Sequence, residues 1–188
     1  MAIVECTDVV KTYQQGKVDV RALRGVTLSV DTGGFVALAG PSGSGKTTLS
    51  KCLNGLLLPT AGSVVVDGHN SKKSSISEMV RRVGYVFQNP DHQLFNSTCR
   101  DEIAYGPKNI GVPKDEIEER VEEAAAVVGL TEEHLEEHPF FLTKGLRQRV
   151  AIAAILALRP QVIIVDEPTT GQDARQAREI MTFLTKLN

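Results

Sequence analysis

Eight consecutive residues have the composition and spacing of a loop that binds phosphate. Gly40-Pro41-Ser42-Gly43-Ser44-Gly45-Lys46-Thr47 fits the pattern G-x-x-x-x-G-K-[ST] at every fixed position. Glycines let the backbone fold around an anion with successive N–H groups pointing inward, and a following helix adds a positive partial charge. Lys46 can then reach the terminal phosphates, and the Thr47 hydroxyl can ligate magnesium. A glycine-rich turn that matches by chance is the alternative, but the loop predicts binding of a nucleoside triphosphate.

Two elements must flank such a loop, and the sequence predicts both of them. Residues 35–39 (Phe-Val-Ala-Leu-Ala) form a short apolar run that is typical of a buried strand. Residues 46–54 contain no helix breaker and are followed by Gly55, which favours a helix that stops there. A strand, a loop and a helix are therefore expected in the order that phosphate binding requires.

A pair of carboxylates follows a second apolar run much later in the chain. Residues 162–165 (Val-Ile-Ile-Val) are typical of a strand in a buried parallel sheet, and Asp166 and Glu167 come directly after it. Ligands gather at the carboxyl ends of parallel strands, where the phosphate loop also lies. Asp166 is thus expected to face the magnesium held by Thr47, directly or through water. Glu167 is expected to polarise an attacking water.

The rest of the chain divides into a β-rich N-terminal part and a helical part. Strand patterns occur at residues 3–10, 22–30, 62–68 and 83–87, with a turn centred on Gly16 and a polar surface loop at residues 70–77. Pro113 is expected at the first position of one helix, which closes at Gly129 and carries an apolar stripe of Ile117, Val121, Ala124 and Val128. A second helix over residues 145–158 is apolar on all sides after its polar start, which predicts burial of its second half.

The overall composition narrows the class of protein. A length of 188 residues suits one domain, with room for an inserted subdomain. The net charge of -2 and the dispersed Lys and Arg residues argue against a nucleic-acid partner. Three widely spaced cysteines form neither a metal-ligand pattern nor a disulfide framework, which favours a reducing cytoplasm. The start of the chain lacks a secretion signal, and the longest apolar run is too short to span a bilayer. A membrane role is therefore expected to come through a partner.

In this order the motifs resemble the nucleotide-binding subunits of ATP-binding cassette (ABC) transporters, over essentially the whole chain. Residues 40–48 are similar to the Walker A motif and residues 162–168 to Walker B, with Glu167 at the place of the catalytic glutamate. Gln88 is similar to the Q-loop glutamine, which in that family contacts magnesium and the membrane partner. Residues 147–153 resemble the helix after the family signature, and residues 170–173 resemble the D-loop.

The resemblance implies a fold and a set of ligands. The fold is an α/β P-loop NTPase core with a mainly parallel sheet, an N-terminal antiparallel β subdomain and an inserted helical subdomain at residues 89–160. The whole of residues 1–188 would be one ABC ATPase domain that lacks the family's final strand and helices. ATP and Mg²⁺ are the implied cofactors, with the metal held by Thr47, Gln88 and Asp166, and catalysis by Glu167, Lys46 and Gln88. The residues implied to hold ATP are Gly40, Pro41, Ser42, Gly43, Ser44, Gly45, Lys46, Thr47 and Thr48. Tyr13 resembles the aromatic residue that stacks on adenine, although it could equally be a core residue of its strand.

Residues 88–95 and 101–107 narrow the resemblance to the ATPases of energy-coupling factor transporters, which include cobalt and vitamin importers. This implies a transported metal ion or vitamin, which the membrane subunits of that family select. It also implies a second ABC ATPase subunit in a homodimer or heterodimer, and membrane subunits that dock near the Q-loop. The expected location is the cytoplasmic face of the cell membrane. His92 in this segment is interpreted as a solvated loop residue.

The sequence departs from the family in two places. The signature, usually Leu-Ser-Gly-Gly-Gln, is here Leu142-Thr143-Lys144-Gly145-Leu146. In the family this motif contacts the nucleotide held by the partner subunit. Thr143 keeps the hydroxyl donor of the family's serine, and Gly145 keeps the glycine that permits a close approach of the backbone. The family also has a switch histidine after Walker B, whereas the four histidines here all precede Asp166.

Several functions remain open at this stage. A transport ATPase accounts for most of the motifs. A nucleotide-binding subunit that does not hydrolyse ATP is the alternative favoured by the altered signature. A soluble ABC ATPase of repair or translation, or a small-molecule kinase, would explain fewer of the motifs.

Overall fold

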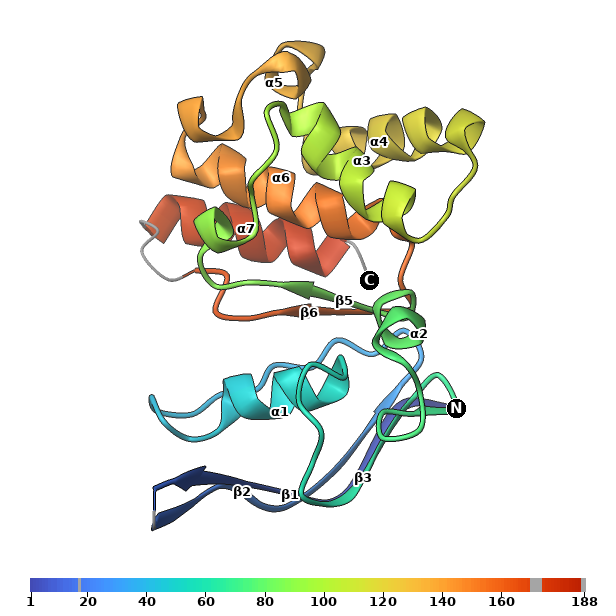
Figure 1. Ribbon diagram of the computed structural model, residues 1–188. Coiled ribbons are helices and arrows are strands. Elements are labelled where there is room, and N and C mark those ends of the chain that lie inside the picture. The colour runs from blue at the N-terminus through green and yellow to red at the C-terminus, as the bar shows by residue number, and fades with distance from the viewer. Residues whose placement is uncertain (17, 170–173, 187–188) are drawn as a thin grey trace. The chain divides into compact units, whose positions relative to one another are not determined.

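The computed structural model describes residues 1–16, 18–169 and 174–186, which form two compact units. The first unit is Met1–Val83, and the second begins at Gly84. The first holds β1 (Ala2–Gln15), β2 (Val18–Asp31), α1 (Lys46–Leu53), β3 (Ala61–Val66), β4 (His69–Asn70) and α2 (Ile76–Val80) (Figure 1). The elements from the unit boundary onward are β5 (Val83–Val86), η1 (Pro90–His92), α3 (Cys99–Asn109), α4 (Lys114–Val128), α5 (Glu132–Glu136), η2 (Pro139–Phe141), α6 (Lys144–Leu156), β6 (Val162–Val165) and α7 (Ala174–Lys186).

The first unit is built on an antiparallel sheet with the strand order β2-β1-β3-β4. β1 and β2 form a long hairpin that turns at Gly16, and the pairing runs from Ala2 opposite Asp31 to Gln15 opposite Val18. The strands predicted at residues 3–10, 22–30 and 62–68 are thus confirmed, and the first two are longer than predicted. β3 turns into β4 at Asp67 and Gly68, whose positive φ angles of 48° and 73° suit a two-residue hairpin.

The core of the first unit lies between this sheet and α1. α1 packs against β3 and β2, and the buried apolar residues of this part of the unit are Val4, Cys6, Val9, Leu23, Val64 and Val66 from the strands and Leu49, Cys52 and Leu53 from the helix. Burial, together with the nearby Cys52 thiol, raises the pKa of Cys6 to about 11, so this thiol stays protonated at neutral pH. The predicted helix after the phosphate-loop motif is confirmed, with Asn54 as its C-cap and Gly55 at φ 78°.

The strand predicted at residues 35–39 is wrong. The structure assigns no strand there, and Phe35, Val36 and Leu38 are 50%, 56% and 43% exposed. The physical reason is that an extended apolar segment becomes a strand only when a neighbour takes up its N–H and C=O groups. Among the described residues, no strand pairs with this segment. Apolar composition alone therefore does not decide its conformation.

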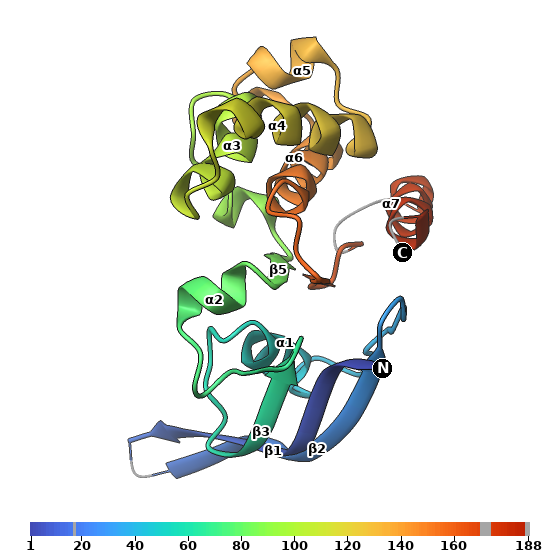
Figure 2. The same cartoon turned by 90° about the vertical axis from the view of Figure 1, so that its right-hand side faces the viewer.

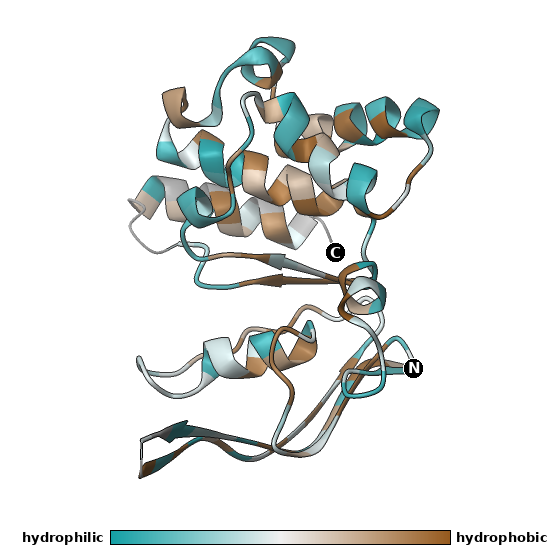
Figure 3. Cartoon of the chain, in the orientation of Figure 1, coloured by the Kyte–Doolittle hydropathy of each residue, from teal (hydrophilic) through white to brown (hydrophobic). Residues whose placement is uncertain are grey.

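The second unit combines a two-stranded parallel sheet with a group of packed helices. β5 and β6 pair with one another, which confirms the strands predicted at residues 83–87 and 162–165. β6 is hydrophobic along its length (Figure 3), yet its residues are half-buried, because β5 is the one strand that pairs with it in the described part of the chain. The fold class expected from the sequence, an α/β protein with antiparallel and parallel sheets, is confirmed.

Helices α3, α4 and α6 pack against each other and form the core of the second unit (Figure 2). The predicted apolar stripe of α4 is buried, and Gly129 ends the helix with a φ of 70°. Pro113 is the N-cap of α4 and not its first helical residue. The second half of α6, from Val150 to Ala154, is buried as the sequence predicts. None of the helices in the described ranges is long and apolar enough to cross a membrane.

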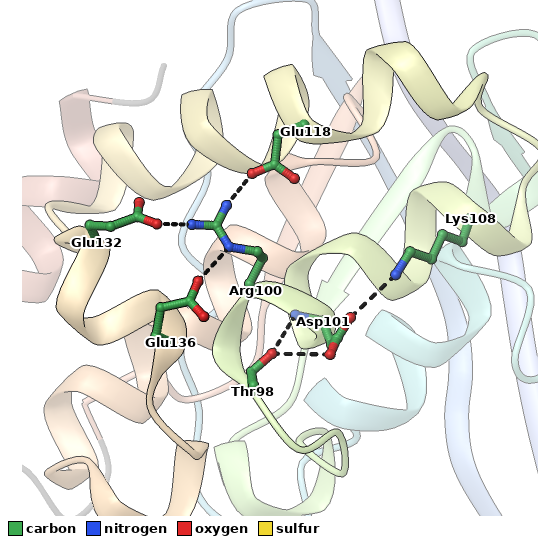
Figure 4. A network of polar contacts seen from close by, with 7 residues as sticks. All are labelled: Thr98, Arg100, Asp101, Lys108, Glu118, Glu132 and Glu136. Carbon is green, nitrogen blue, oxygen red and sulfur yellow. Dashed lines mark hydrogen bonds and ion pairs between the residues drawn. The ribbon is translucent and has the colours of Figure 1, made fainter.

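One arginine side chain links α3, α4 and α5 on the outside of the core. Arg100 of α3 forms ion pairs with Glu118 of α4 and with Glu132 and Glu136 of α5, the last at 2.8 Å (Figure 4). These carboxylates raise the pKa of the Arg100 guanidinium further above its usual range. One side chain thus bridges α3, α4 and α5 through three ion pairs.

Gly62 offers a test of the close packing between β1 and β3. Its φ is 76°, and an added Cβ would lie 2.1 Å from the backbone oxygen of Asp8, at the irregularity where the β1–β3 register shifts. Replacing Gly62 by alanine is expected to lower the free energy of unfolding by about 3 kcal/mol, measured by urea denaturation. Gly68→Ala is the matched control, because Gly68 has a similar φ of 73° but open space around it. Equal losses for the two variants would contradict a role of steric contact.

Candidate functional site

The phosphate-loop motif ends at the start of a helix whose N-cap residue is a glycine. Gly45 is the N-cap of α1, it provides no side-chain hydrogen bond, and the first turn contains no acidic residue. The first N–H groups of a helix lack acceptors within the helix, and the helix dipole adds a positive partial charge there. A helix that begins with glycine and lysine is therefore suited to an external anion such as phosphate.

The loop in front of α1 is tightly folded. Gly45 has a φ of 92°, and an added Cβ would lie 2.6 Å from the backbone oxygen of Ala22, so no larger residue fits without a backbone shift. The Lys46 ammonium lies over the loop and donates to the backbone oxygens of Gly40 at 2.8 Å and Pro41 at 3.1 Å. The glycine-lined backbone and the lysine above it fit a triphosphate, whose oxygens could replace these carbonyl acceptors.

Tyr13 lies beside the last residue of the predicted ATP-binding stretch. Its hydroxyl is 3.4 Å from the Thr48 hydroxyl, and the half-buried residue lies near the C-terminal end of β1. The Lys11 ammonium lies 5.5 Å from the ring centre, in a cation–π contact. Tyr13 thus belongs to the same unit and the same neighbourhood as the loop. The stacking of its ring on adenine stays a prediction.

In the second unit, β5 and β6 bring Gln88 and Glu167 together. The backbone N–H of Asp166 donates to the carbonyl of Val86 at 3.1 Å, so the two strands end at the same level. The side-chain amide of Gln88 donates to Glu167 Oε2 at 2.8 Å, although 79 positions separate the two residues. Glu167 has a φ of 46°, a left-handed conformation that costs a residue of this type about 1 kcal/mol or more. The predicted catalytic carboxylate therefore sits on a strained backbone, and the predicted Q-loop side chain holds it.

Asp166 has a partner that the sequence interpretation missed. The hydroxyl of Tyr85, in the middle of β5, donates to Asp166 Oδ2 at 2.8 Å. Tyr85 is 7% exposed and packs edge-on against Phe87, with ring centres 5.0 Å apart. Burial, together with the hydrogen bond to Asp166, raises the pKa of the Tyr85 hydroxyl, which therefore remains a proton donor. A tyrosine within the strand that pairs with β6 is the sequence signal that could have revealed it.

The chain after Gln88 is anchored to the helical core by polar contacts. Arg147 of α6 forms an ion pair with Asp91 at 2.7 Å. The amide of Gln93 donates to the carbonyl of Ala151, also in α6, at 2.9 Å. Glu102 of α3, which is only 3% exposed, accepts hydrogen bonds from the backbone N–H groups of Phe95 and Asn96 in the same segment. A displacement of this segment would therefore break or shift its contacts with α6.

The altered signature lies at the start of α6. Thr143 is the N-cap, and its hydroxyl accepts from the backbone N–H of Leu146 at 3.4 Å. Arg147 donates to the carbonyl of Leu142 at 2.7 Å. Thr143, Gly145 and Leu146 line a cavity of about 350 Å³. Lys144 is exposed, so its side chain does not disturb the packing of the helix.

The predicted site residues thus fall into two groups. Tyr13 and residues 40–48 belong to the first unit, whereas Gln88, Thr143, Gly145, Asp166 and Glu167 belong to the second. The predicted D-loop, residues 170–173, lies outside the described residues. The predicted metal ligands, Thr47, Gln88 and Asp166, are divided between the units, and their common site stays a prediction.

The chemistry of these three ligands fits Mg²⁺. A hydroxyl, an amide carbonyl and a carboxylate are the hard oxygen donors that Mg²⁺ prefers. Gln88 uses its amide nitrogen for Glu167, so its oxygen is the atom that a cation would take. Within the described part of the chain, no three His, Cys, Asp or Glu side chains group into a metal site. Such a sparse set suits a Mg²⁺ ion that takes its other ligands from phosphate and water.

Comparison with protein families matches residues 23–170 to the family described as ABC transporter. The energy-coupling factor transporter ATP-binding protein EcfA of Methanothermobacter thermautotrophicus is 43% identical over 99% of this chain and 59% of its own length. The EcfA protein of Methanocaldococcus jannaschii is 45% identical over 100% of this chain and 67% of its own length. A relative from Caldanaerobacter subterraneus, named as an ABC transporter ATP-binding protein, is 49% identical, and the chain covers 32% of it. The chain thus spans one third to two thirds of these curated relatives.

Two solved structures share this fold. One is cbiO1 from Clostridium perfringens, described as part of the ABC transporter complex cbiONQ. It has a TM-score of 0.87 at 32% identity and covers 99% of this chain and 73% of that chain. The other is a dimeric ATP-binding cassette in a post-hydrolysis state, bound to ADP and Pi. It has a TM-score of 0.85 at 31% identity, over 98% of this chain and 82% of that chain.

The ion pair between Asp91 and Arg147 can be tested with a double-mutant cycle. Asp91→Asn, Arg147→Gln and the double variant are expected to give a coupling energy of about 1 kcal/mol, measured by urea denaturation. The control is the pair of Glu123 and Arg159, which lie 2.6 Å apart but have side chains about half exposed, and whose coupling should be smaller. A coupling of zero between Asp91 and Arg147 would show that the ion pair does not hold the segment to α6.

Proposed function

Because the chain belongs to the ABC transporter family, we propose that it binds and hydrolyses ATP with Mg²⁺ as a subunit of an importer of the energy-coupling factor type. The observation that carries the hydrolytic part of this proposal is the hydrogen bond between Gln88 and Glu167. It joins the two side chains that the family resemblance assigns to the Q-loop and to catalysis. The strained backbone of Glu167 supports the same conclusion, since strain of this kind gathers at functional sites.

The first unit supplies phosphate binding. The N–H groups at the start of α1 and the Lys46 ammonium would hold the β- and γ-phosphates, and the glycines let the backbone approach them. Lys46 would exchange its present carbonyl acceptors, those of Gly40 and Pro41, for phosphate oxygens. Thr47 and Asp166 would hold Mg²⁺, which when bound neutralises charge on the phosphates.

The second unit supplies the hydrolytic groups. Glu167 would orient a water for in-line attack on the γ-phosphate and polarise its O–H bond. Gln88 fixes the Glu167 carboxylate through its amide, so the carboxylate needs little rearrangement before the attack. Lys46 then stabilises the charge that develops on the transferred phosphoryl group.

Gly145 supports the part of the proposal that concerns a second ATPase subunit. Glycine in the first turn of a helix is less stable than alanine by up to about 1 kcal/mol. An added Cβ at this position would meet no described atom within 4 Å, so packing against the described residues does not require glycine there. A close approach by a molecule outside the chain would require it. We assign that molecule as ATP bound by the partner, in keeping with the dimeric cassette that shares this fold.

The membrane partner is assigned to the segment that follows Gln88. This segment is anchored to α6 through Asp91 and Gln93, so a membrane subunit bound to it could act on the helix that begins with the signature. This chain would lie on the cytoplasmic face of the membrane, and the transported solute would be a metal ion or a vitamin. The EcfA names of two relatives and the complex that contains cbiO1 support this assignment.

A second candidate function is a subunit that binds ATP without hydrolysing it. Lys144 and Leu146 favour it, because they replace the first Gly and the Gln of the signature at the start of α6. In a homodimer, both ATP sites would contain this altered signature. In a heterodimer, only the ATP site of the partner would be affected.

Replacing Glu167 by glutamine tests the hydrolytic function. Removal of the carboxylate leaves phosphate binding intact but stops water activation, so ATP should hold the subunits in a stable dimer. Size-exclusion chromatography with and without ATP measures the shift, and phosphate release measures turnover, which should fall at least about a hundredfold. Glu122→Gln, an exposed change on α4, is the control and should behave like the original chain. Turnover that survives in Glu167→Gln would refute the assigned role.

Restoring the signature separates the two candidate functions. The double variant Lys144→Gly/Leu146→Gln should raise kcat about tenfold if the chain hydrolyses ATP as a homodimer, because each signature then stabilises the transition state at the other site. The affinity of this chain for a fluorescent ATP analogue should stay unchanged, since the phosphate loop is intact. Absence of turnover both before and after the restoration would favour the non-hydrolysing subunit.

A further inference from the structure

Asp166 depends on a neutral side chain of the neighbouring strand. The Tyr85 hydroxyl donates to one carboxylate oxygen, Asp166 Oδ2, at 2.8 Å, and the backbone N–H of Asp166 is fixed by Val86 at 3.1 Å. β5 thus contributes a contact to the backbone of Asp166 and another to its carboxylate. A buried tyrosine hydroxyl needs a partner in any protein, but here the partner is the carboxylate assigned to Mg²⁺.

The identity of the donor matters for a metal ligand. A positively charged donor would neutralise the carboxylate and compete with a cation, whereas a neutral hydroxyl orients the carboxylate and leaves its negative charge in place. Residues that hydrogen-bond to metal ligands commonly change metal affinity by about 10- to 100-fold when they are altered. Tyr85 is also held firmly, because it is nearly fully buried and packs edge-on against Phe87.

We propose that Tyr85 is a positioning residue that sets the affinity of the site for Mg²⁺ by fixing the orientation of the Asp166 carboxylate. The proposal rests on the proposed function, since Asp166 is assigned there as a ligand of Mg²⁺. It adds a residue outside the Walker and Q-loop motifs to the groups on which the site depends. Tyr85 itself touches neither nucleotide nor metal in this scheme.

Tyr85→Phe tests the proposal, because it removes the hydroxyl and keeps the ring. A fluorescent ATP analogue is titrated in EDTA and at rising Mg²⁺, and Mn²⁺ binding in the presence of ATP is followed by electron paramagnetic resonance. In EDTA the affinity for the analogue should change less than twofold. The Mg²⁺ concentration that gives half of the maximal change in binding of the analogue should rise about tenfold, and so should the Kd for Mn²⁺. Tyr105→Phe is the matched control, since Tyr105 is 46% exposed on α3, outside the site, and should give unchanged values.

A double-mutant cycle with Asp166→Asn separates positioning from general loosening of the sheet. If Tyr85 acts through Asp166, its hydroxyl should have no further effect on Mn²⁺ affinity once the carboxylate is gone. Additive losses, an unchanged Mn²⁺ affinity in Tyr85→Phe, or an equal loss of affinity in EDTA would overturn the proposal. If the chain does not hydrolyse ATP but Tyr85→Phe weakens Mn²⁺ binding, the proposed hydrolytic function is refuted and the positioning role of Tyr85 is supported.

Discussion

The pairing of β5 with β6 is the constraint on which the second unit depends. Strands of four residues each are short, yet their carboxyl ends are aligned by the hydrogen bond from the Asp166 N–H to the Val86 carbonyl. Two residues after Val86 the chain reaches Gln88, and one residue after Asp166 it reaches Glu167. The contact between these side chains is a direct result of that alignment. A shift by one residue would turn Asp166 away from Tyr85 as well, because successive side chains of a strand point to opposite faces.

The backbone at Glu167 shows what this arrangement costs. A φ of 46° is unfavourable for glutamate, and it persists only if the surroundings stabilise it. On one side lies the ordered strand β6, held to β5 through Asp166. On the other lies the hydrogen bond from Gln88. Since Gln88 leads into a segment that is tied to α6 by Asp91 and Gln93, the conformation of Glu167 is coupled to the helical part of its unit.

The sequence predicted the elements whose signals are local and failed where a partner was needed. Gly55 and Gly129 ended helices as expected, and the apolar stripe of α4 is buried. Residues 35–39 are as apolar as β6, but no neighbouring strand in the described ranges makes them a strand. Gln88 and Glu167 were singled out by motif, yet their contact follows from the pairing of β5 and β6, which no single segment encodes. Tyr85 was missed for the same reason, because a tyrosine in a strand is ordinary until its neighbour is known.

At the start of α6, a structural reason accounts for one of the signature residues but not for another. Thr143 has a sufficient structural reason to be present, since its hydroxyl caps the helix, and a serine would do the same. Its retention is therefore weak evidence for contact with a nucleotide. Gly145 has no such reason among the described residues, because it weakens the helix and a methyl group there would meet none of their atoms within 4 Å. Lys144 and Leu146 lie in the same turn and carry side chains that the family lacks. Of the three positions 144–146, only Gly145 keeps the family residue, and neither the stability of the helix nor a contact with the described residues accounts for it.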